Sequence, residues 1–343
     1  MIIVRMKRDT ILIGSEDWDY STDAVMQWLK FYGEKVIRVN MEDEPEIESV
    51  DIGHGQFDFR IGLKNGDSFS LTQIKSYWLR RSELQFISRQ ISFGEGQSFS
   101  HVQKSLNRHL KMEIKTVQDF LEYVFKTSRQ IRTLGANANY AGNKLINLKV
   151  AEFVGLKIPA TSILSSKQAL ANLLKNTPSL ITKTISDLNP IHFKIDEKNF
   201  RYVTYTNPID GSHLPAIQDE FFPSLFQNHL EKKLEIRIFY LAGKCFAMAI
   251  FSQNDDKTKT DFRRYNNVTP NMRAPFELPD DIQEKIRLFM QKIELDCGSI
   301  DMVYTKIGEF VFLEVNPFGQ FGMVSFPCNY YLEKEIADYL CGN

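Results

Sequence analysis

The chain has 343 residues, roughly two to three times the usual size of one domain, which excludes a single small domain and predicts two or three packed units. Hydrophobic residues make up 43% of the sequence, enough for sizeable cores and against a disordered or fibrous chain. A formal net charge of −1 at pH 7 argues against nucleic acid or an anionic membrane surface as a partner.

The spacing of the cysteines and histidines matches neither a zinc site nor a disulfide framework. No stretch approaches the ~20 apolar residues that cross a bilayer. We therefore expect a protein of the reducing cytoplasm with no membrane-spanning segment.

The amino-terminal part of the sequence predicts an α/β unit. Residues 10–39 alternate between a short apolar strand, an amphipathic helix that ends at Gly33 and a second strand, which is a βαβ opening. Residues 57–71 predict a hairpin around Asn65 and Gly66.

Residues 74–82 predict a further strand, which ends in Arg80 and Arg81. Ligands of open α/β sheets bind beyond the carboxyl ends of the strands. One of the two arginines is therefore expected to face a ligand cleft, and the sequence leaves open which one.

Residues 101–132 predict a long amphipathic helix whose polar side has four positive charges in excess. Lys104, Arg108, Lys111 and Lys115 recur at spacings of three and four, so they share one helix face. Two interpretations have equal support: a solvated helix face, or a docking surface for an acidic peptide.

Further along the chain, Asn143 is expected to cap a helix that Gly155 ends, and short strands and helices follow. The expected fold class is α/β and α+β in three domains. An amino-terminal α/β domain covers 1–100, a central small domain with the basic helical stretch covers 101–215, and a carboxyl-terminal domain covers 216–343.

Residues 299–317 predict two strands joined by a short turn. A symmetric hairpin that pairs residue 305 with residue 310 places Asp301 opposite Glu314. Carboxylates that face each other across a ladder repel one another, whereas a divalent cation between them reverses the sign of the interaction.

The same register places Ser299 opposite Asn316, on the face that carries the two carboxylates. Oxygen-only ligands suit Mg²⁺, which takes its remaining oxygens from water and substrate phosphates. Asp301, Glu314 and Asn316 are therefore predicted to bind Mg²⁺ next to a nucleotide.

At this point the chain resembles the ATP-grasp superfamily. Asp301 followed after twelve residues by EVNP is similar to the metal-binding end of that superfamily. Other similar pieces occur in the superfamily's order: NK at 143–144, GLKIPAT at 155–161, Lys183 in SLITKT, LEIR at 234–237 and TDFR at 260–263. The resemblance covers about residues 135–325 and implies an ATP-grasp fold, with the amino-terminal unit as the pre-ATP-grasp domain and ATP and Mg²⁺ as cofactors.

The resemblance also implies a nucleotide site. Arg237 shares a strand face with Glu235, and it either pairs with Glu235 or points at a phosphate. No glycine occurs between Lys183 and Gly211, so hydroxyl groups are expected to replace a glycine-rich phosphate loop. The implied residues are Lys144 and Lys183 for the phosphates, Gln227, Asn228 and Leu230 for adenine, and Glu235 for ribose.

More narrowly, YWLRRS at 77–82 and FLEVNPFGQF at 312–321 resemble the ATP-grasp peptide maturases that make graspetides, most closely those of the grasp-with-spasm type. These enzymes join Asp or Glu side chains of a ribosomal precursor peptide to Ser, Thr or Lys side chains. The family's DxR motif matches Asp261 and Arg263, which would engage the reacting core peptide, the alternative being a surface salt bridge.

The expected function is thus an ADP-forming ligase that macrocyclises a precursor peptide with a leader and an acidic core. The first alternative is a ligase that adds an amino acid to a carboxylate, as ribosomal-protein glutamate ligases do. The second is a nucleotide-dependent peptide-binding module without turnover. The sequence leaves open which precursor is used, whether the bond is an ester or an amide, the ring topology and the general base. It also leaves open the oligomeric state, for which a homodimer is one option.

Overall fold

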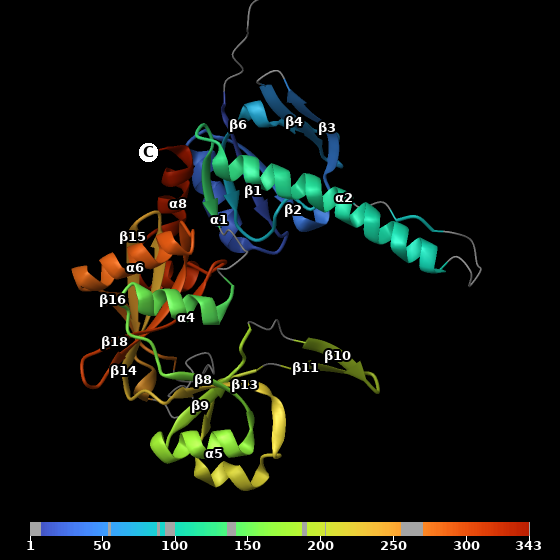
Figure 1. Cartoon of the computed structure of the whole chain (residues 1–343). Coiled ribbons are helices and arrows are strands. Elements are labelled where there is room, and N and C mark those ends of the chain that lie inside the picture. The colour runs from blue at the N-terminus through green and yellow to red at the C-terminus, as the bar shows by residue number, and fades with distance from the viewer. Residues whose placement is uncertain are drawn as a thin grey trace, which may run out of the picture. The chain divides into compact units, whose positions relative to one another are not determined.

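The computed structural model describes residues 8–53, 56–87, 90–92, 100–135, 142–186, 191–202, 204–254 and 270–342. It divides into two compact units (Figure 1). The first comprises Met1–Gly135 and Tyr331–Asn343, and the second comprises Ala136–Tyr330. In the part of the chain that is described, no helix is long and apolar enough to cross a membrane.

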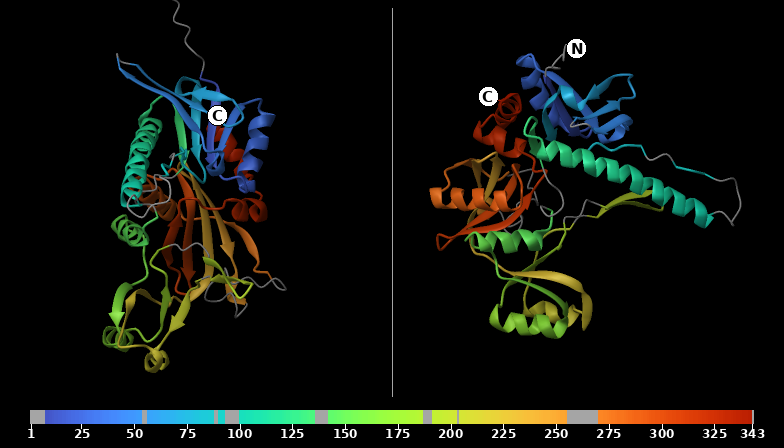
Figure 2. Two further views of the ribbon diagram at one scale, coloured as in Figure 1. Left: turned by 90° about the vertical axis from the view of Figure 1, so that its right-hand side faces the viewer. Right: turned by 45° about the horizontal axis from the view of Figure 1, so that its top comes forward.

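The first unit is built on a parallel sheet with strand order β2-β1-β6-β7. Helix α1 connects β1 to β2, so the predicted βαβ opening is confirmed, and the last helix of the chain, α8, packs beside α1 (Figure 2). The elements are β1 (Thr10–Ser15), α1 (Tyr20–Phe31), β2 (Lys35–Asn40), η1 (Met41–Asp43), β6 (Ile74–Leu79), β7 (Arg132–Gly135) and α8 (Leu332–Cys341).

A smaller antiparallel sheet completes this unit, with β3 (Glu46–Gly53), β4 (Gln56–Gly62) and β5 (Ser68–Ser70), followed by η2 (Leu71–Gln73). Gly66 forms the predicted turn between β4 and β5 with a φ of 88°, which favours glycine. The long helix α2 (Ser100–Thr127) lies against this sheet, where Phe125 contacts Phe59. The basic helix therefore belongs to the first unit, which differs from the expected boundary at residue 100.

The described strands of the second unit form a four-stranded sheet, a five-stranded sheet and a two-stranded ribbon, and the four-stranded, smaller sheet has strand order β12-β9-β13-β8. Helix α5 covers one face through Leu170 and Leu174, which pack on Leu180 and Phe226. This sheet extends to Asn228, beyond the expected boundary at 215. The elements are β8 (Thr161–Ser166), α5 (Lys167–Asn176), β9 (Leu180–Lys183), β12 (Asn207–Ile209), η4 (Gly211–Ala216) and β13 (Glu220–Asn228), with a separate exposed ribbon of β10 (Ile191–Ile195) and β11 (Lys198–Tyr202).

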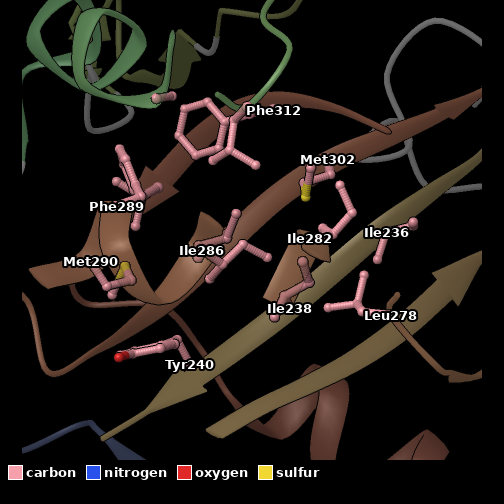
Figure 3. Packing of buried hydrophobic residues seen from close by; sticks show 14 of the residues in the cluster. Ile236, Ile238, Tyr240, Leu278, Ile282, Ile286, Phe289, Met290, Met302 and Phe312 are labelled. Atoms are coloured by element: carbon pink, nitrogen blue, oxygen red, sulfur yellow. The ribbon is translucent and has the colours of Figure 1, made fainter. Parts of the chain in front are cut away.

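The larger sheet has strand order β16-β15-β14-β17-β18 and forms the main core (Figure 3). Ile236 and Ile238 point from β14 toward Ile286 and Phe289 of α6. Because side chains alternate along a strand, the odd-numbered residues of β14 face the other side. The elements are α4 (Lys144–Phe153), β14 (Lys232–Leu241), β15 (Lys244–Ile250), η5 (Ser252–Asn254), β16 (Arg273–Phe276), α6 (Asp280–Lys292), β17 (Cys297–Thr305), β18 (Phe310–Asn316) and α7 (Gly322–Cys328).

Candidate active site

Three neighbouring strands of the larger sheet carry one row of charged side chains. Arg237 on β14 pairs with Asp301 on β17, which in turn pairs with Glu314 on β18. Paired residues of a sheet point to the same face, so these three side chains lie next to one another. The row lies on the face opposite the apolar core.

The register between β17 and β18 contains a β-bulge. Near the turn Tyr304 pairs with Phe310, so the predicted pairing of residue 305 with 310 is wrong by one position. The register then shifts between Asp301 and Met302. Beyond the shift, the predicted pairing of Asp301 with Glu314 is confirmed, and so is that of Ser299 with Asn316.

Core packing explains the bulge. Phe312 and Val315 are both buried in the core, at 0% and 4% exposed, although they are three residues apart. In a regular strand, residues an odd number apart point to opposite faces. The bulge lets both side chains face the core while Glu314 points to the other side.

Each carboxylate of the row has a cationic partner. Nη1 of Arg237 donates to both carboxylate oxygens of Asp301, at 2.9 and 2.7 Å. Oε2 of Glu314 lies 3.4 Å from Nζ of Lys144 and 3.7 Å from Nζ of Lys183. Three cations thus face two carboxylates, which offsets the repulsion expected between Asp301 and Glu314.

The two lysines come from different parts of the second unit. Lys144 is the first residue of α4, which Asn143 caps as predicted, its side chain accepting from the backbone N–H groups of Leu145 and Ile146. Lys183 is the last residue of β9 in the smaller sheet. Both side chains are largely buried, at 10% and 13% exposed, so the fold gathers two largely buried lysines at one carboxylate.

Glu235 has partners other than Arg237. Its Oε1 accepts from Nζ of Lys232 at 2.7 Å and from the hydroxyl of Ser252 at 2.8 Å. Burial raises the pKa of Glu235, and Lys232 and Ser252 offset part of that shift. Of the two roles expected for Arg237, the pairing with Glu235 is wrong, because the guanidinium binds Asp301 instead.

The end of β13 presents buried polar atoms. Gln227 is 1% exposed, and its Nε2 donates to Oγ1 of Thr161 at 2.9 Å. Oε1 of Gln227 and Oδ1 of Asn228 are buried and have no hydrogen-bond partner among the described residues. Buried acceptors of this kind are normally satisfied. They fit a ligand that brings N–H donors, such as the amino group of adenine, next to the half-buried Leu230.

The turn after β18 orients Asn316. Its Oδ1 accepts from the backbone N–H of Phe318 at 3.0 Å. A Cβ on Gly319 would lie 2.1 Å from Oγ of Ser299 and 2.6 Å from its backbone nitrogen, so only glycine fits there. Sequence analysis missed the role of Gly319, although its place in NPFG two residues after Pro317 could have suggested a tight turn.

Known proteins resemble this chain in structure and not in a family model or a curated sequence. No protein-family model and no curated protein sequence matches the chain. Solved structures do match it. A RiPP-associated ATP-grasp ligase from Chryseobacterium gregarium, solved with ADP and a leader and core peptide, is 25% identical with a TM-score of 0.73, and 97% of each chain is covered. The macrocyclase MdnC from Microcystis aeruginosa, solved with precursor peptide MdnA, is 22% identical with a TM-score of 0.69, covering 97% of this chain and 100% of that one.

The chain has the ATP-grasp fold. The expected fold class and the resemblance to ATP-grasp peptide ligases are confirmed. A third similar structure, the ATP-grasp ligase PsnB solved with a minimal precursor, Mg and ADP, is 14% identical with a TM-score of 0.67, covering 100% of this chain and 99% of that one.

The residues of this ATP-grasp site fit a magnesium-nucleotide complex. Among the described residues no three His, Cys, Asp or Glu side chains form a metal site by themselves. Asp301, Glu314 and Asn316 offer oxygen ligands only, which suits a cation that takes further oxygens from phosphates. The excess positive charge of Arg237, Lys144 and Lys183 suits those phosphates.

The arginines expected to bind peptide lie in the first unit, after β6. Nε of Arg80 donates to Oδ2 of Asp19 at 2.9 Å, and both side chains are 4% exposed. Nη2 of Arg81 lies 3.6 Å from Oδ1 of Asp19, and its guanidinium lies 5.3 Å from the ring centroid of Trp18. Burial alone would raise the pKa of Asp19, but the Arg80 charge and the Thr22 hydrogen bond outweigh it and lower that pKa.

This cluster lies where the sheet order reverses. The chain runs outward from β1 to β2 on one side and to β6 on the other, so the loops after β1 and β6 meet at the topological switch point. Sequence analysis named Arg80 and Arg81 but missed Asp19, which lies about sixty positions away.

The four basic residues of α2 are exposed. Lys115 pairs with Asp119 at 2.6 Å and lies 3.7 Å from Glu83, and the Asp119 hydrogen bond raises its pKa. Lys104, Arg108 and Lys111 form no ion pair with any described residue. The two remaining site predictions, Asp261 and Arg263, lie outside the described residues.

Proposed function

We propose that this chain is an ADP-forming ATP-grasp ligase that crosslinks a ribosomal precursor peptide. An Asp or Glu carboxylate of the peptide takes the γ-phosphoryl group and becomes an acyl phosphate. A Ser, Thr or Lys side chain then attacks the acyl carbon, loses its proton and displaces phosphate, which leaves an ester or an amide. The observation that carries the proposal is the row of Arg237, Asp301 and Glu314, with Lys144 and Lys183 converging on Glu314.

Charge exchange is the central step at this row. Lys144 and Lys183 would turn from Glu314 to the phosphate oxygens, and Glu314, Asp301 and Asn316 would hold the metal. Bound Mg²⁺ supplies neutralisation of the charge that develops on the transferred group. Arg237 can keep one Asp301 oxygen while its remaining donors reach a phosphate. Largely buried cations would act strongly here, because few water molecules would screen them.

The other end of the nucleotide would lie at β13 and β14. The unsatisfied amide oxygens of Gln227 and Asn228 would accept from the adenine amino group, and Leu230 would pack against the ring. Glu235 would accept from the ribose hydroxyls through Oε2, while Lys232 and Ser252 hold Oε1.

The peptide substrate is proposed from the similar structures, whose complexes contain leader, core or precursor peptides. Arg263 and Asp261 would engage the reacting carboxylate, because a guanidinium recognises a planar carboxylate or acyl phosphate through two parallel bonds. Arg81 would face the peptide, whereas Arg80 is occupied by Asp19. The face of Lys104, Arg108, Lys111 and Lys115 would dock an acidic leader.

Incubation of the protein with ATP, Mg²⁺ and a neighbouring short precursor tests the function. Mass spectrometry should show the loss of one water per crosslink, with equal amounts of ADP and phosphate released. A mass gain of one amino acid would instead identify the amino-acid ligase. Peptide binding with nucleotide but no ATP turnover would identify the binding module.

Three further expectations stay predictions: a cytoplasmic location, the absence of a nucleic acid partner, and assembly as a homodimer. Size-exclusion chromatography with light scattering tests the last of these.

A further inference from the structure

A pocket of about 570 Å³ opens at one end of the smaller sheet. The residues after β9, those leading into β12 and the start of β13 line it, and antiparallel pairing brings these three segments to the same sheet end. Lys183 belongs to its lining, and so do Thr184 and Ser186, which stand where a glycine-rich loop would otherwise be expected.

The described lining of the pocket contains a cationic side chain and hydroxyl groups but no acidic side chain. Lys183 is cationic, and none of the lining residues that the structure describes is acidic. Hydroxyl groups are supplied by Thr184, Ser186, Thr204 and Ser224. Tyr205 and Phe222 provide aromatic walls, and Phe222 is 85% exposed. A carboxylate entering this pocket meets a cation and hydrogen-bond donors, and none of the described lining residues carries a like charge.

Strand β13 orders the pocket relative to the nucleotide residues. Gln227, with its unsatisfied buried oxygen, pairs with Ile181, and two positions earlier Leu225 pairs with Lys183. Phe222 comes three residues before Leu225, about 10 Å further along at the rise of a strand. A nucleotide with its base at Gln227 and its phosphates at Lys183 would therefore end at the mouth of the pocket.

Lys183 links the pocket to the metal ligands as well. Its Nζ lies 3.7 Å from Glu314, so the same side chain borders the carboxylate row and the pocket. A group that accepts the γ-phosphoryl group must lie directly beyond the phosphates, within reach of that ammonium.

We propose that this pocket binds the core segment of the precursor, with the reacting carboxylate at Lys183 and the hydroxyl-rich lining around its neighbours. The inference rests on the proposed function, and it says where on the protein the core segment of the peptide substrate binds. Tyr205 and Phe222 would cover the apolar parts of the core peptide. The Thr and Ser hydroxyls would bind its backbone and polar side chains.

Ser224 offers the sharpest test, because its hydroxyl donates to the backbone oxygen of Phe222 and its side chain is half-buried at the pocket wall. Ser224→Glu places a carboxylate in the pocket and should raise the KM for core peptide about tenfold by like-charge repulsion. Ser224→Gln has the same size without the charge and should change the KM by less. The affinity for ADP, measured by calorimetry, should stay the same in both.

Ser165→Glu is the matched control, since Ser165 is an exposed residue of β8 in the same sheet and lies outside the pocket. It should leave the KM unchanged. Phe222→Ala, at a position too exposed to affect folding, should also raise the KM for core peptide. Unchanged KM values in Ser224→Glu and Phe222→Ala would overturn the pocket assignment, and so would a loss of ADP affinity instead of peptide affinity. If the wild-type protein forms no crosslink, the proposed function itself fails.

Discussion

The two units hold buried carboxylates among different partners. In the second unit Asp301 and Glu314 face three cationic side chains from β14, α4 and β9. In the first unit Asp19 is enclosed by two arginines, and Glu122 accepts a hydrogen bond from Tyr77 at 3.0 Å. The row of the second unit has one positive charge in excess, which suits an incoming anion.

The Asp19–Arg80 pair of the first unit and the Glu314 cluster of the second unit also differ in solvent exposure. Asp19 and Arg80 are each 4% exposed and lie 2.9 Å apart, which identifies them as a structural pair. Glu314 is 23% exposed, and the lysines that approach it lie at 3.4 and 3.7 Å, longer than the best ion pairs. Charges that must change partners during a reaction are held loosely, and charges that hold a loop in place are held tightly.

The largest effect is expected at the row. Glu314→Gln removes a metal ligand that also receives two lysines, and turnover should fall up to about 10³-fold. Melting temperature should change little, because the substituted side chain stays on the face away from the core. Glu309→Gln, on the same hairpin and paired with Lys157, is the control and should keep its activity. Wild-type turnover in Glu314→Gln would remove this residue from the metal site.

The next largest effect is expected on stability, at the Asp19–Arg80 pair of the first unit. Arg80→Met leaves Asp19 buried without its closest partner and should cost about 3 to 5 kcal/mol of unfolding free energy. Arg81→Met should cost less than Arg80→Met, because Nη2 of Arg81 lies 3.6 Å from Asp19 and the Arg81 side chain is more exposed, at 14% against 4%. The three tryptophans, Trp18, Trp28 and Trp78, all belong to the first unit, so urea titration followed by tryptophan fluorescence reports on that unit. Equal losses in both variants would contradict the assignment of Arg80 as the structural partner.

Glu122 provides a pH-dependent comparison. Burial, together with the nearby Glu83 charge, raises its pKa to about 7. A carboxyl group whose folded pKa is raised binds protons more tightly in the folded state, so the stability of the first unit should fall as pH rises from about 4.5 to about 7. Glu122→Gln should remove this loss, on the order of 3 kcal/mol at pH 8. Tryptophan-detected urea titrations at pH 5 and pH 8 measure it, and an unchanged pH dependence in the variant would locate the titrating group elsewhere.

Local patterns predicted much of this structure. The βαβ opening, the β4–β5 turn, the cap at Asn143 and the pairing of Asp301 with Glu314 follow from side-chain period, turn residues and capping residues. The resemblance placed Lys144 and Lys183 at one site, and the structure brings both to Glu314.

Other features depend on contacts distant in the sequence. The bulge near Asp301 exists because Phe312 and Val315 both enter a core built by α6, which no hairpin pattern contains. Asp19 selects Arg80 over Arg81 from a loop far along the chain. Helix α2 joins the first unit through aromatic contacts with β4, so composition alone could not set the domain boundary.

A smaller effect tests the charge exchange at the row. Without nucleotide, Mn²⁺ should bind weakly, because Lys144 and Lys183 neutralise Glu314 and the row is net positive. Lys183→Met should strengthen Mn²⁺ binding in the absence of nucleotide about tenfold and weaken ADP binding. Electron paramagnetic resonance titration measures the free Mn²⁺, and Lys157→Met is the control. Tight Mn²⁺ binding by the wild-type protein alone would contradict charge exchange.

The smallest effect is expected on the basic face of α2, where exposed charges are screened by salt. Lys115 already pairs with Asp119, so the informative change is Lys104→Glu with Lys111→Glu, two residues without an ion pair among those described. The KM for full precursor should rise a few-fold at low salt and less at physiological salt, whereas a leaderless core peptide should be unaffected.

The matched control is Lys30→Glu with Lys35→Glu, which makes the same charge change at exposed positions of α1 and β2 in the same unit. The control separates the local effect of the α2 face from the change in net charge, which both double variants share. A rise in KM for both substrates, or for neither, would leave α2 as a solvated helix face. The leader would then have to be recognised by another part of the protein.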